Sequence, residues 1–263
     1  MPEVISSNLI GALEAFASQA TILIALDFDG TLAPLVNDPE DSRMLTPARQ
    51  ALEKLTAMSG VTVAIVTGRA IDSVKRVADP LKEWFLVGSH GIEVLSPGEV
   101  FSYETPWLVP ADLTEAFDAL VNAHPGTRLE LKPFGLALHT RGVEQTVAQD
   151  AESAAHKVCD AWGGDLVVRT GHGIVECSIQ EATKGDGIHE VRRRLRPSAV
   201  LFAGDDRTDE DGFRALGKTD ISIKIGQENT DARFHLDSPY DMAETLQRLY
   251  RIRRGFAIDR GED

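Results

Sequence analysis

Short, almost entirely apolar runs recur along the chain and are separated by segments with helical periodicity. The runs lie at residues 22–26, 61–66, 84–87 and 199–203. Runs of this length are typical of strands buried on both faces, as in parallel sheets covered by helices. Apolar residues spaced three and four positions apart predict helices at 8–18, from Thr46-Pro47 to about 58, and at 70–78. The pattern indicates an α/β fold with a Rossmann-like parallel sheet.

Residues from about 105 to 181 break this alternation. A link that contains Pro106 and Pro110 leads into a different series of elements. The series is a helix at 112–122, strands at 128–132 and 136–140, a helix at 144–162 ending at Gly163-Gly164, and strands at 166–169 and 173–179. An αββαββ order predicts an antiparallel sheet. We therefore predict an α+β module at 108–181, inserted into a core domain formed by 1–107 and 182–263.

The alternating pattern returns after the insertion. A helix starts near Lys184 and ends in an arginine run, and a strand at 221–225 precedes a last helix predicted at about 239–251. The tail from Arg253 onward is polar and is predicted to be frayed.

The amino-acid composition argues against some classes of binding partner. The chain has 263 residues, 27 Lys and Arg against 41 Asp and Glu, and a formal charge of −14. This charge argues against nucleic acid or an anionic membrane surface as a partner. No apolar run approaches the ~18 residues of a membrane span, and no secretory signal is apparent. The two cysteines, Cys159 and Cys177, have no metal-like spacing and fit a reduced, cytoplasmic location.

Two carboxylates follow the first apolar run directly. Asp27 and Asp29 come after the strand predicted at 22–26, and the reactive crevice of a parallel sheet lies beyond the carboxyl ends of its strands. One carboxylate at this place can act as a nucleophile and the other can move a proton. Both can also bind a hard cation such as Mg²⁺. The alternative is an Asx-rich turn without chemistry.

Further polar groups follow other strands of the predicted sheet. Thr67-Gly68-Arg69 after the second strand fits a phosphate grip or a capped turn. His90 follows the third strand and either contacts substrate or is an ordinary loop histidine. Lys184 opens a helix, and an acidic run begins at Asp205 after the strand at 199–203. A parallel sheet would bring these groups together although they are far apart in sequence.

The joint pattern resembles the ordered motifs of the haloacid-dehalogenase-like (HAD) phosphatases. The insertion is similar to the αββ-repeat (type C2) cap of one subclass, and within it the sequence resembles the trehalose-6-phosphate phosphatase family from about residue 20 to 250. The stretches that carry the resemblance are 26–34, 67–69, 88–93, 130–132 with 138–141, 184–185 and 204–210. The segment Glu176-Cys177-Ser178-Ile179 departs from relatives that carry an acidic residue followed by Arg-Pro.

The resemblance implies an aspartyl-phosphate mechanism. Asp27 would attack phosphorus, and Asp29 would protonate the leaving oxygen and then activate water. Mg²⁺ would be held by Asp27, the backbone carbonyl of Asp29 and Asp205, with Asp209 nearby.

The phosphate oxygens would be bound by Thr67 and Lys184, with Arg69 and His90 as further substrate contacts. In the cap, the expected sugar contacts are Glu130, Lys132 and Glu176.

The implied substrate is a small sugar phosphate, trehalose 6-phosphate, and the implied pathway neighbour is trehalose-6-phosphate synthase. An alternative is the same chemistry on sucrose phosphate or mannosyl-phosphoglycerate, since enzymes for these substrates would differ from this one only in the cap. A receiver-like phosphoacceptor would be about half this length. An inert relative that docks a synthase would be expected to lack Asp27, Asp29 or Lys184, and all three are present. A phosphomutase is disfavoured because Asp29 would be placed to activate water.

Overall fold

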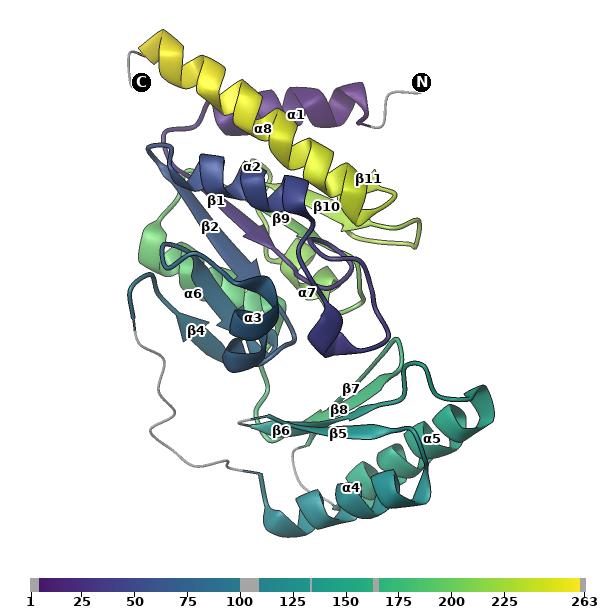
Figure 1. The fold of residues 1–263 in the computed structure, drawn as a ribbon. Helices are drawn as coiled ribbons and strands as arrows, with labels where there is room; N and C mark the ends of the chain where they lie inside the picture. Colours follow the sequence, from purple (N-terminus) through teal and green to yellow (C-terminus); the bar gives the residue numbers. More distant parts are fainter. Residues whose placement is uncertain (1–4, 100–108, 133, 163–165, 261–263) are drawn as a thin grey trace. The chain divides into compact units, whose positions relative to one another are not determined.

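A computed structural model describes residues 5–99, 109–132, 134–162 and 166–260. The chain divides into two compact units, Met1–Val100 with Ala182–Asp263, and Phe101–Glu181 (Figure 1). The predicted link at Pro106, the boundary at 107 and the helix end at Gly163-Gly164 lie outside the described residues. No described helix combines the length and apolar character needed to cross a membrane.

The first unit is built on a seven-stranded sheet with the order β11-β10-β9-β1-β2-β3-β4. Only β4 pairs antiparallel with its neighbour. The strands are β1 (Ile22–Leu26), β2 (Val61–Val66), β3 (Phe85–Gly88), β4 (Glu93–Leu95), β9 (Ala199–Gly204), β10 (Ile221–Ile225) and β11 (Phe234–Leu236). The predicted parallel sheet is confirmed, whereas β4 and β11 were not predicted because each has only three residues.

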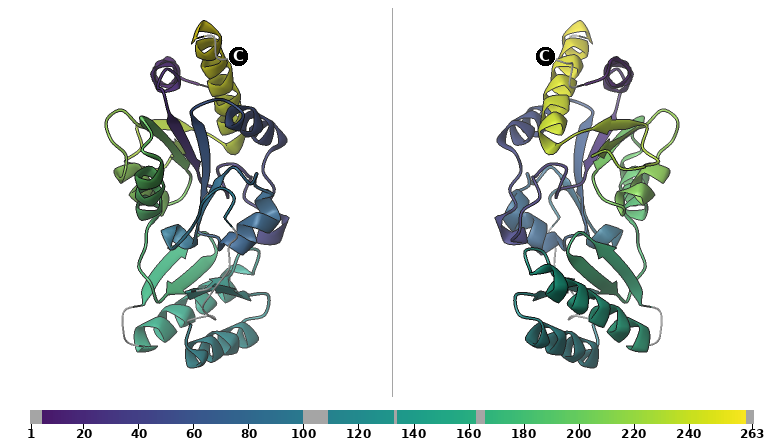
Figure 2. Two further views of the ribbon diagram at one scale, coloured as in Figure 1. Left: turned by 90° about the vertical axis from the view of Figure 1, so that its left-hand side faces the viewer. Right: turned by 90° about the vertical axis from the view of Figure 1, so that its right-hand side faces the viewer.

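Helices cover both faces of this sheet (Figure 2). They are α1 (Ser7–Ala17), α2 (Thr46–Thr56), α3 (Ile71–Ala78), α6 (Lys184–Leu195), α7 (Asp209–Arg214) and α8 (Pro239–Arg260). On one face, Ile188 of α6 and Phe213 of α7 pack on a cluster that includes Leu23 and Phe202. On the other face α2 contacts β2 and α1 contacts β10, and both helices pack against α8. Burial on both faces explains why the strand segments are almost entirely apolar.

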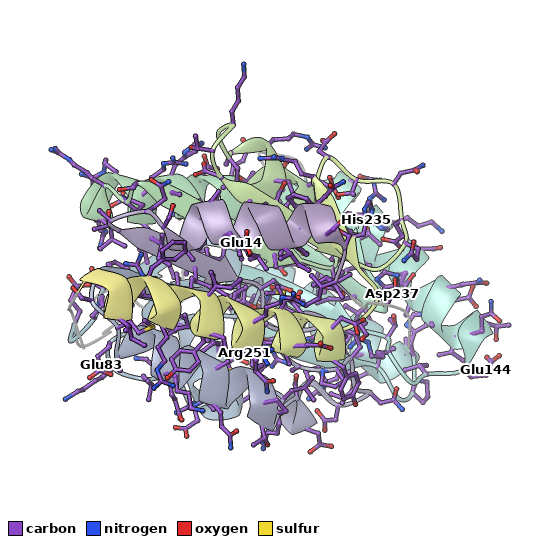
Figure 3. All side chains as sticks on the ribbon, turned by 90° about the horizontal axis from the view of Figure 1, so that it is seen from above. Glu14, Glu83, Glu144, His235, Asp237 and Arg251 are labelled. Atoms are coloured by element: carbon purple, nitrogen blue, oxygen red, sulfur yellow. The ribbon has the colours of Figure 1, made fainter. Side chains whose placement is uncertain are left out.

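The last helix is longer than the sequence pattern predicts. Helix α8 continues through Arg253 to Arg260, and the predicted frayed tail is wrong over this stretch. Arg253 is buried, and its guanidinium donates to the carbonyls of Ala17, Gln19, Ala20 and Ser59. Seen from above, α1 and α8 lie side by side (Figure 3). A charged residue in an otherwise polar tail gave no sign of this anchoring role.

The second unit is a four-stranded antiparallel sheet with two helices on one face. Its strands are β5 (Arg128–Lys132), β6 (Gly135–His139), β7 (Val167–Gly171) and β8 (Ile174–Ser178), in the order β5-β6-β8-β7. Its helices are α4 (Ala111–Ala123) and α5 (Gln145–Trp162). Leu136, Leu138, Val175 and Cys177 pack with Leu113 and Phe117 of α4 and with the small residues of α5. The predicted α+β architecture of this segment is therefore confirmed.

Candidate active site

A buried lysine joins two carboxylates at the carboxyl end of the core sheet. The Nζ of Lys184 lies 2.8 Å from Oδ1 of Asp27 and 2.7 Å from Oδ1 of Asp209. Lys184 is the first residue of α6, and a capping box between Thr183 and Asp186 fixes this helix start. Asp27 follows β1 directly, and its N–H donates to the carbonyl of Ala203 in β9. The residues therefore come from three elements that the parallel sheet holds together.

Two glycines allow the acidic groups to approach so closely. Gly30 has a φ of +80°, and a Cβ added there would lie 1.9 Å from Oδ2 of Asp205. A Cβ added at Gly204 would lie 2.1 Å from Cγ of Asp209. Any larger residue at either position would collide with a carboxylate. The glycines thus bring the β1 loop and the β9 loop within reach of one another.

Asp27, Asp205 and Asp209 form a donor set that fits a divalent cation. One carboxylate oxygen from each lies within 4.8 Å of the others. Oxygen-only, carboxylate-rich donors are what hard cations such as Mg²⁺ prefer. These three carboxylates lie near two described ammonium groups, those of Lys184 and Lys224, so negative charge is in excess and a bound cation would offset it. The side chain of Asp29 is not part of this set.

Burial and mutual repulsion perturb the proton equilibria of this cluster. Burial raises the pKa of Asp27 well above its ordinary value, Lys184 opposes this, and the charges of Asp209 and Asp205 add to it. Burial, together with the charge of Asp209, raises the pKa of Asp205 to about 7. Burial lowers the pKa of Lys184, but Asp209 and Asp27 more than offset this and leave it above its ordinary value. Lys184 therefore stays charged.

These pKa shifts predict a pH-dependent effect of metal on stability. Without metal, the folded protein binds protons at Asp205 that the unfolded chain has released above a pKa of 3.8. The contribution of protonated Asp205 to the free energy of unfolding is therefore complete below about pH 4 and is lost as pH rises through about 7. Bound Mg²⁺ would replace those protons. We expect the rise in Tm on adding Mg²⁺ to be larger at pH 8 than at pH 5, as measured by thermal unfolding against EDTA.

The control for this prediction is Asp205→Asn, which removes the titrating carboxyl and replaces one anionic metal donor by a neutral amide. In this variant the Mg²⁺-induced rise in Tm should shrink at pH 8. A rise of equal size at both pH values in the unaltered protein would contradict the assignment.

Asp29 is held by an ion pair with Arg69. Nε of Arg69 lies 2.6 Å from Oδ2 of Asp29, and Nη2 lies 2.8 Å from Oδ1. The hydroxyl of Ser42 also donates to Oδ1 at 2.8 Å. The structure thus places Arg69, expected as a substrate contact, against the carboxylate expected as the proton donor.

Thr67 and His90 lie on the neighbouring strand ends. Thr67 is buried after β2, and its hydroxyl accepts the N–H of Arg69 at 3.2 Å. The N–H of His90 donates to the carbonyl of Thr67, and the imidazole lies directly against Gly68. His90 and Ser89 both have positive φ, a costly conformation for residues other than glycine. The 3₁₀ turn Ser89–Gly91 (η2) therefore holds the imidazole over the Thr67-Gly68-Arg69 turn.

In the second unit, the predicted sugar contacts share the sheet face that points away from α4 and α5. Glu130, Ala137 and Glu176 are direct cross-strand partners and so lie on one face. Nζ of Lys132 lies 2.5 Å from Oε2 of Glu176, and both side chains are buried. His139 lies 2.8 Å from Oε2 of Glu130. Burial raises the pKa of Glu130, but the hydrogen bond from His139 and the charge of Lys132 bring it below its ordinary value.

Sequence reasoning missed two polar residues near the acidic cluster. Lys224, in β10, is buried, and its ammonium donates to the main-chain carbonyl of Asp205. A single lysine within the otherwise strand-like segment 221–225 was the available signal. Ser42 lies in the polar loop after β1, where no pattern distinguishes a hydroxyl that contacts Asp29 from one that faces solvent.

Comparison with known proteins places the sequence in a family. Residues 25–244 match the trehalose-phosphatase family. A trehalose-phosphate phosphatase of Mycobacterium leprae is 32% identical over 253 residues, which cover 87% of this chain and 57% of that protein. An uncharacterized glycosyl hydrolase of Mycobacterium tuberculosis is 30% identical over 92% of this chain, but only 20% of its own length is covered. The chain thus spans little more than half of the first relative and a fifth of the second.

Solved structures share the fold. The C-terminal domain of the Candida albicans trehalose-6-phosphate phosphatase superposes with a TM-score of 0.79 at 22% identity, covering 94% of this chain and 97% of that one. The C-terminal domain of a Candida albicans trehalose synthase regulatory protein gives a TM-score of 0.63 at 14% identity, covering 92% and 97%. A HAD subclass IIB sugar phosphatase gives 0.55 at 15% identity, covering 90% and 100%. With a family match that extends over both units, this chain belongs to the trehalose-phosphatase family of the HAD fold.

Proposed function

We propose that this protein is a Mg²⁺-dependent phosphatase that hydrolyses trehalose 6-phosphate to trehalose and phosphate. The observation that carries the proposal is the convergence of Asp27, Lys184, Asp205 and Asp209 at the carboxyl end of the core sheet. Family membership supports the choice of substrate.

In the first step, a carboxylate oxygen of Asp27 attacks phosphorus and the bond from phosphorus to the sugar oxygen breaks. Asp29 supplies the proton that the leaving oxygen needs. The ammonium of Lys184 and the hydroxyl of Thr67 bind phosphoryl oxygens, whose charge is spread during transfer. Lys184 also orients Asp27 through the 2.8 Å ion pair.

In the second step, water hydrolyses the aspartyl-phosphate. Asp29 accepts a proton from that water and regains the form it had before the first step. Asp27, Asp205 and the main chain at Asp29 would hold Mg²⁺, with Asp209 beside them. When bound, the cation offsets the repulsion between the nucleophile and the anionic phosphate.

In this proposal, the second unit recognises the sugar. Glu130, Lys132 and Glu176 offer charged acceptors and donors on one face of its sheet. Sugar hydroxyls both donate and accept hydrogen bonds, so a face with paired ammonium and carboxylate groups suits them. His90, held over Gly68, is a candidate contact in the first unit.

The direct test is phosphate release from trehalose 6-phosphate beside sucrose phosphate, mannosyl-phosphoglycerate and an aryl phosphate. We expect trehalose 6-phosphate to give the highest kcat/KM, EDTA to abolish turnover, and Mg²⁺ to restore it. Turnover that persists in EDTA would overturn the metal assignment. A higher kcat/KM for another sugar phosphate would be consistent with the proposed chemistry but would assign a different substrate.

Glu176→Gln tests sugar recognition without creating a cavity. The amide keeps the size of the side chain but loses the charge that pairs with Lys132. We expect kcat/KM for trehalose 6-phosphate to fall roughly 10- to 100-fold, the value of one charged hydrogen bond, with little change for the aryl phosphate. Glu115→Gln, an exposed change on α4, is the control. Equal losses on both substrates would place Glu176 outside sugar recognition.

The competing proposal is an inert relative that docks a synthase. The regulatory protein of Candida albicans shows that the fold alone does not decide between the two. The complete set of Asp27, Asp29, Thr67 and Lys184 favours catalysis, since an inert protein has no need of it. We further propose a cytoplasmic location. We also propose trehalose-6-phosphate synthase as the pathway neighbour, because the product of that enzyme is the proposed substrate.

A further inference from the structure

The two oxygens of the Asp29 carboxyl group have different surroundings. Oδ1 accepts one hydrogen bond from Ser42 and one from Nη2 of Arg69. Oδ2 accepts one hydrogen bond, from Nε of Arg69. A carboxylate oxygen has two lone pairs. Among the described residues, therefore, Oδ1 has both lone pairs occupied, whereas Oδ2 keeps one for another partner.

The contacts of Arg69 determine this asymmetry. Nη2 donates to the carbonyl of Pro39 as well as to Asp29, and Nη1 donates to Ser73 at 3.3 Å. Four of the five guanidinium N–H groups are thus directed at Asp29, at the loop after β1 and at α3. The guanidinium also lies 5.7 Å from the centre of the Phe28 ring. Such a planar, multiply bonded guanidinium is held in one orientation.

We propose that Arg69, with Ser42, is a positioning residue that presents Oδ2 of Asp29 as the proton-donating oxygen. This inference rests on the proposed function and goes beyond it, because it gives Arg69 a role other than binding phosphate. It also distinguishes the two oxygens of the acid.

The proton balance of the first step is consistent with this arrangement. A protonated Asp29 carries its hydrogen on Oδ2, in the position that Arg69 and Ser42 leave open. As the bond between phosphorus and the leaving oxygen breaks, that proton moves to the leaving oxygen. Asp29 becomes a carboxylate whose other three lone pairs already accept hydrogen bonds from Arg69 and Ser42. No further donor and no co-reactant is needed.

The rival role, a phosphate ligand, predicts different kinetics. A sugar alkoxide needs a proton to leave, whereas p-nitrophenolate leaves without one. Loss of a phosphate ligand should harm both substrates alike. Loss of the group that positions the acid should harm only the sugar phosphate. The quantity to compare is kcat/KM, because it reports the steps up to departure of the leaving group and excludes hydrolysis of the phosphoenzyme, which is common to both substrates.

The experiment compares Arg69→Met, Arg69→Lys and Ser42→Ala with the unaltered protein, on trehalose 6-phosphate and on p-nitrophenyl phosphate with saturating Mg²⁺. For Arg69→Met we expect kcat/KM to fall about 100-fold on the sugar phosphate, within the range of general-acid catalysis. On the aryl phosphate the change should stay below about threefold. Arg69→Lys should recover part of the loss, and Ser42→Ala should show a smaller loss of the same kind. The matched control is Arg76→Met, which removes the nearby contact between α3 and Glu40.

The outcomes separate the inference from the function beneath it. Equal losses on both substrates, or no loss on either, would overturn the role given to Arg69 while leaving the phosphatase intact. An unaltered protein that hydrolyses neither substrate would overturn the proposed function and with it the proton transfer assigned to Asp29. If Arg69→Met does not fold by circular dichroism, Arg69→Lys and Ser42→Ala carry the same comparison.

Discussion

Asp27→Asn is expected to lower the rate of phosphate release by roughly 10⁵-fold or more, the scale seen when a covalent nucleophile is removed. The amide has nearly the size of the carboxylate but cannot attack phosphorus as an anion. The substitution also removes the negative charge of one of the three carboxylates whose oxygens lie within 4.8 Å of one another. The measurement is phosphate release from trehalose 6-phosphate at saturating Mg²⁺.

The fold of the Asp27→Asn variant should survive. Burial already disfavours the charged form of Asp27 and raises its pKa, so a neutral group is tolerated at this place when no metal is bound. Circular dichroism and thermal unfolding in EDTA should resemble those of the unaltered protein. Asp41→Asn, an exposed change in the 3₁₀ helix Pro39–Asp41, is the control for activity. Turnover within tenfold of normal would remove Asp27 as the nucleophile.

Lys184→Met is expected to affect both catalysis and stability. The ammonium would stabilise the phosphoryl group in the transition state, so kcat should fall by ~10³-fold. The ammonium also forms ion pairs with Asp27 and Asp209, which are both buried. Removing one partner from a buried ionic cluster typically costs about 3–5 kcal/mol of unfolding free energy. That cost should be greatest at high pH, where the raised pKa of Asp27 no longer keeps it protonated.

Urea unfolding in EDTA and in Mg²⁺, at pH 5 and pH 8, measures these effects. We expect Mg²⁺ to restore part of the stability lost by Lys184→Met, since the cation offsets the same carboxylates, but none of the activity. The control is Lys54→Met, on the exposed side of α2. If Lys184→Met is as stable as the unaltered protein at pH 8 in EDTA, the lysine is not the counter-charge of this cluster.

The parallel sheet and the convergence of its strand ends could be predicted from the sequence. Buried strands leave a direct record in almost entirely apolar runs, and parallel pairing brings their carboxyl ends to one edge. Asp27, Lys184 and the acidic run from Asp205 were therefore expected to lie close together, although the order of the strands was not predicted. The side chain of Asp29 lies apart from the cluster of Asp27, Asp205 and Asp209 and is bonded by Arg69 and Ser42, and sequence periodicity does not encode such side-chain contacts.

Contacts made by single long side chains explain what the sequence did not reveal. Arg253 and Lys224 are charged residues that bond main-chain carbonyls in the interior. Their residue types normally indicate solvent exposure, so pattern reasoning assigned the tail to the surface and gave Lys224 no role. The roles of Glu130, Lys132 and Glu176 remain predictions.

The chain passes from the second unit to the first at Ala182, two residues before Lys184. The capping box of Thr183 and Asp186 occupies this junction. The two reciprocal hydrogen bonds of the capping box lie between this connection and the side chain of Lys184. A distortion of the connection would therefore act on these bonds before it reached the ammonium. Residues 101–181 could therefore be exchanged for another insertion, by evolution or in the laboratory, while the lysine keeps its alignment. If the proposed function holds, the capping box would separate the choice of sugar from the phosphoryl chemistry.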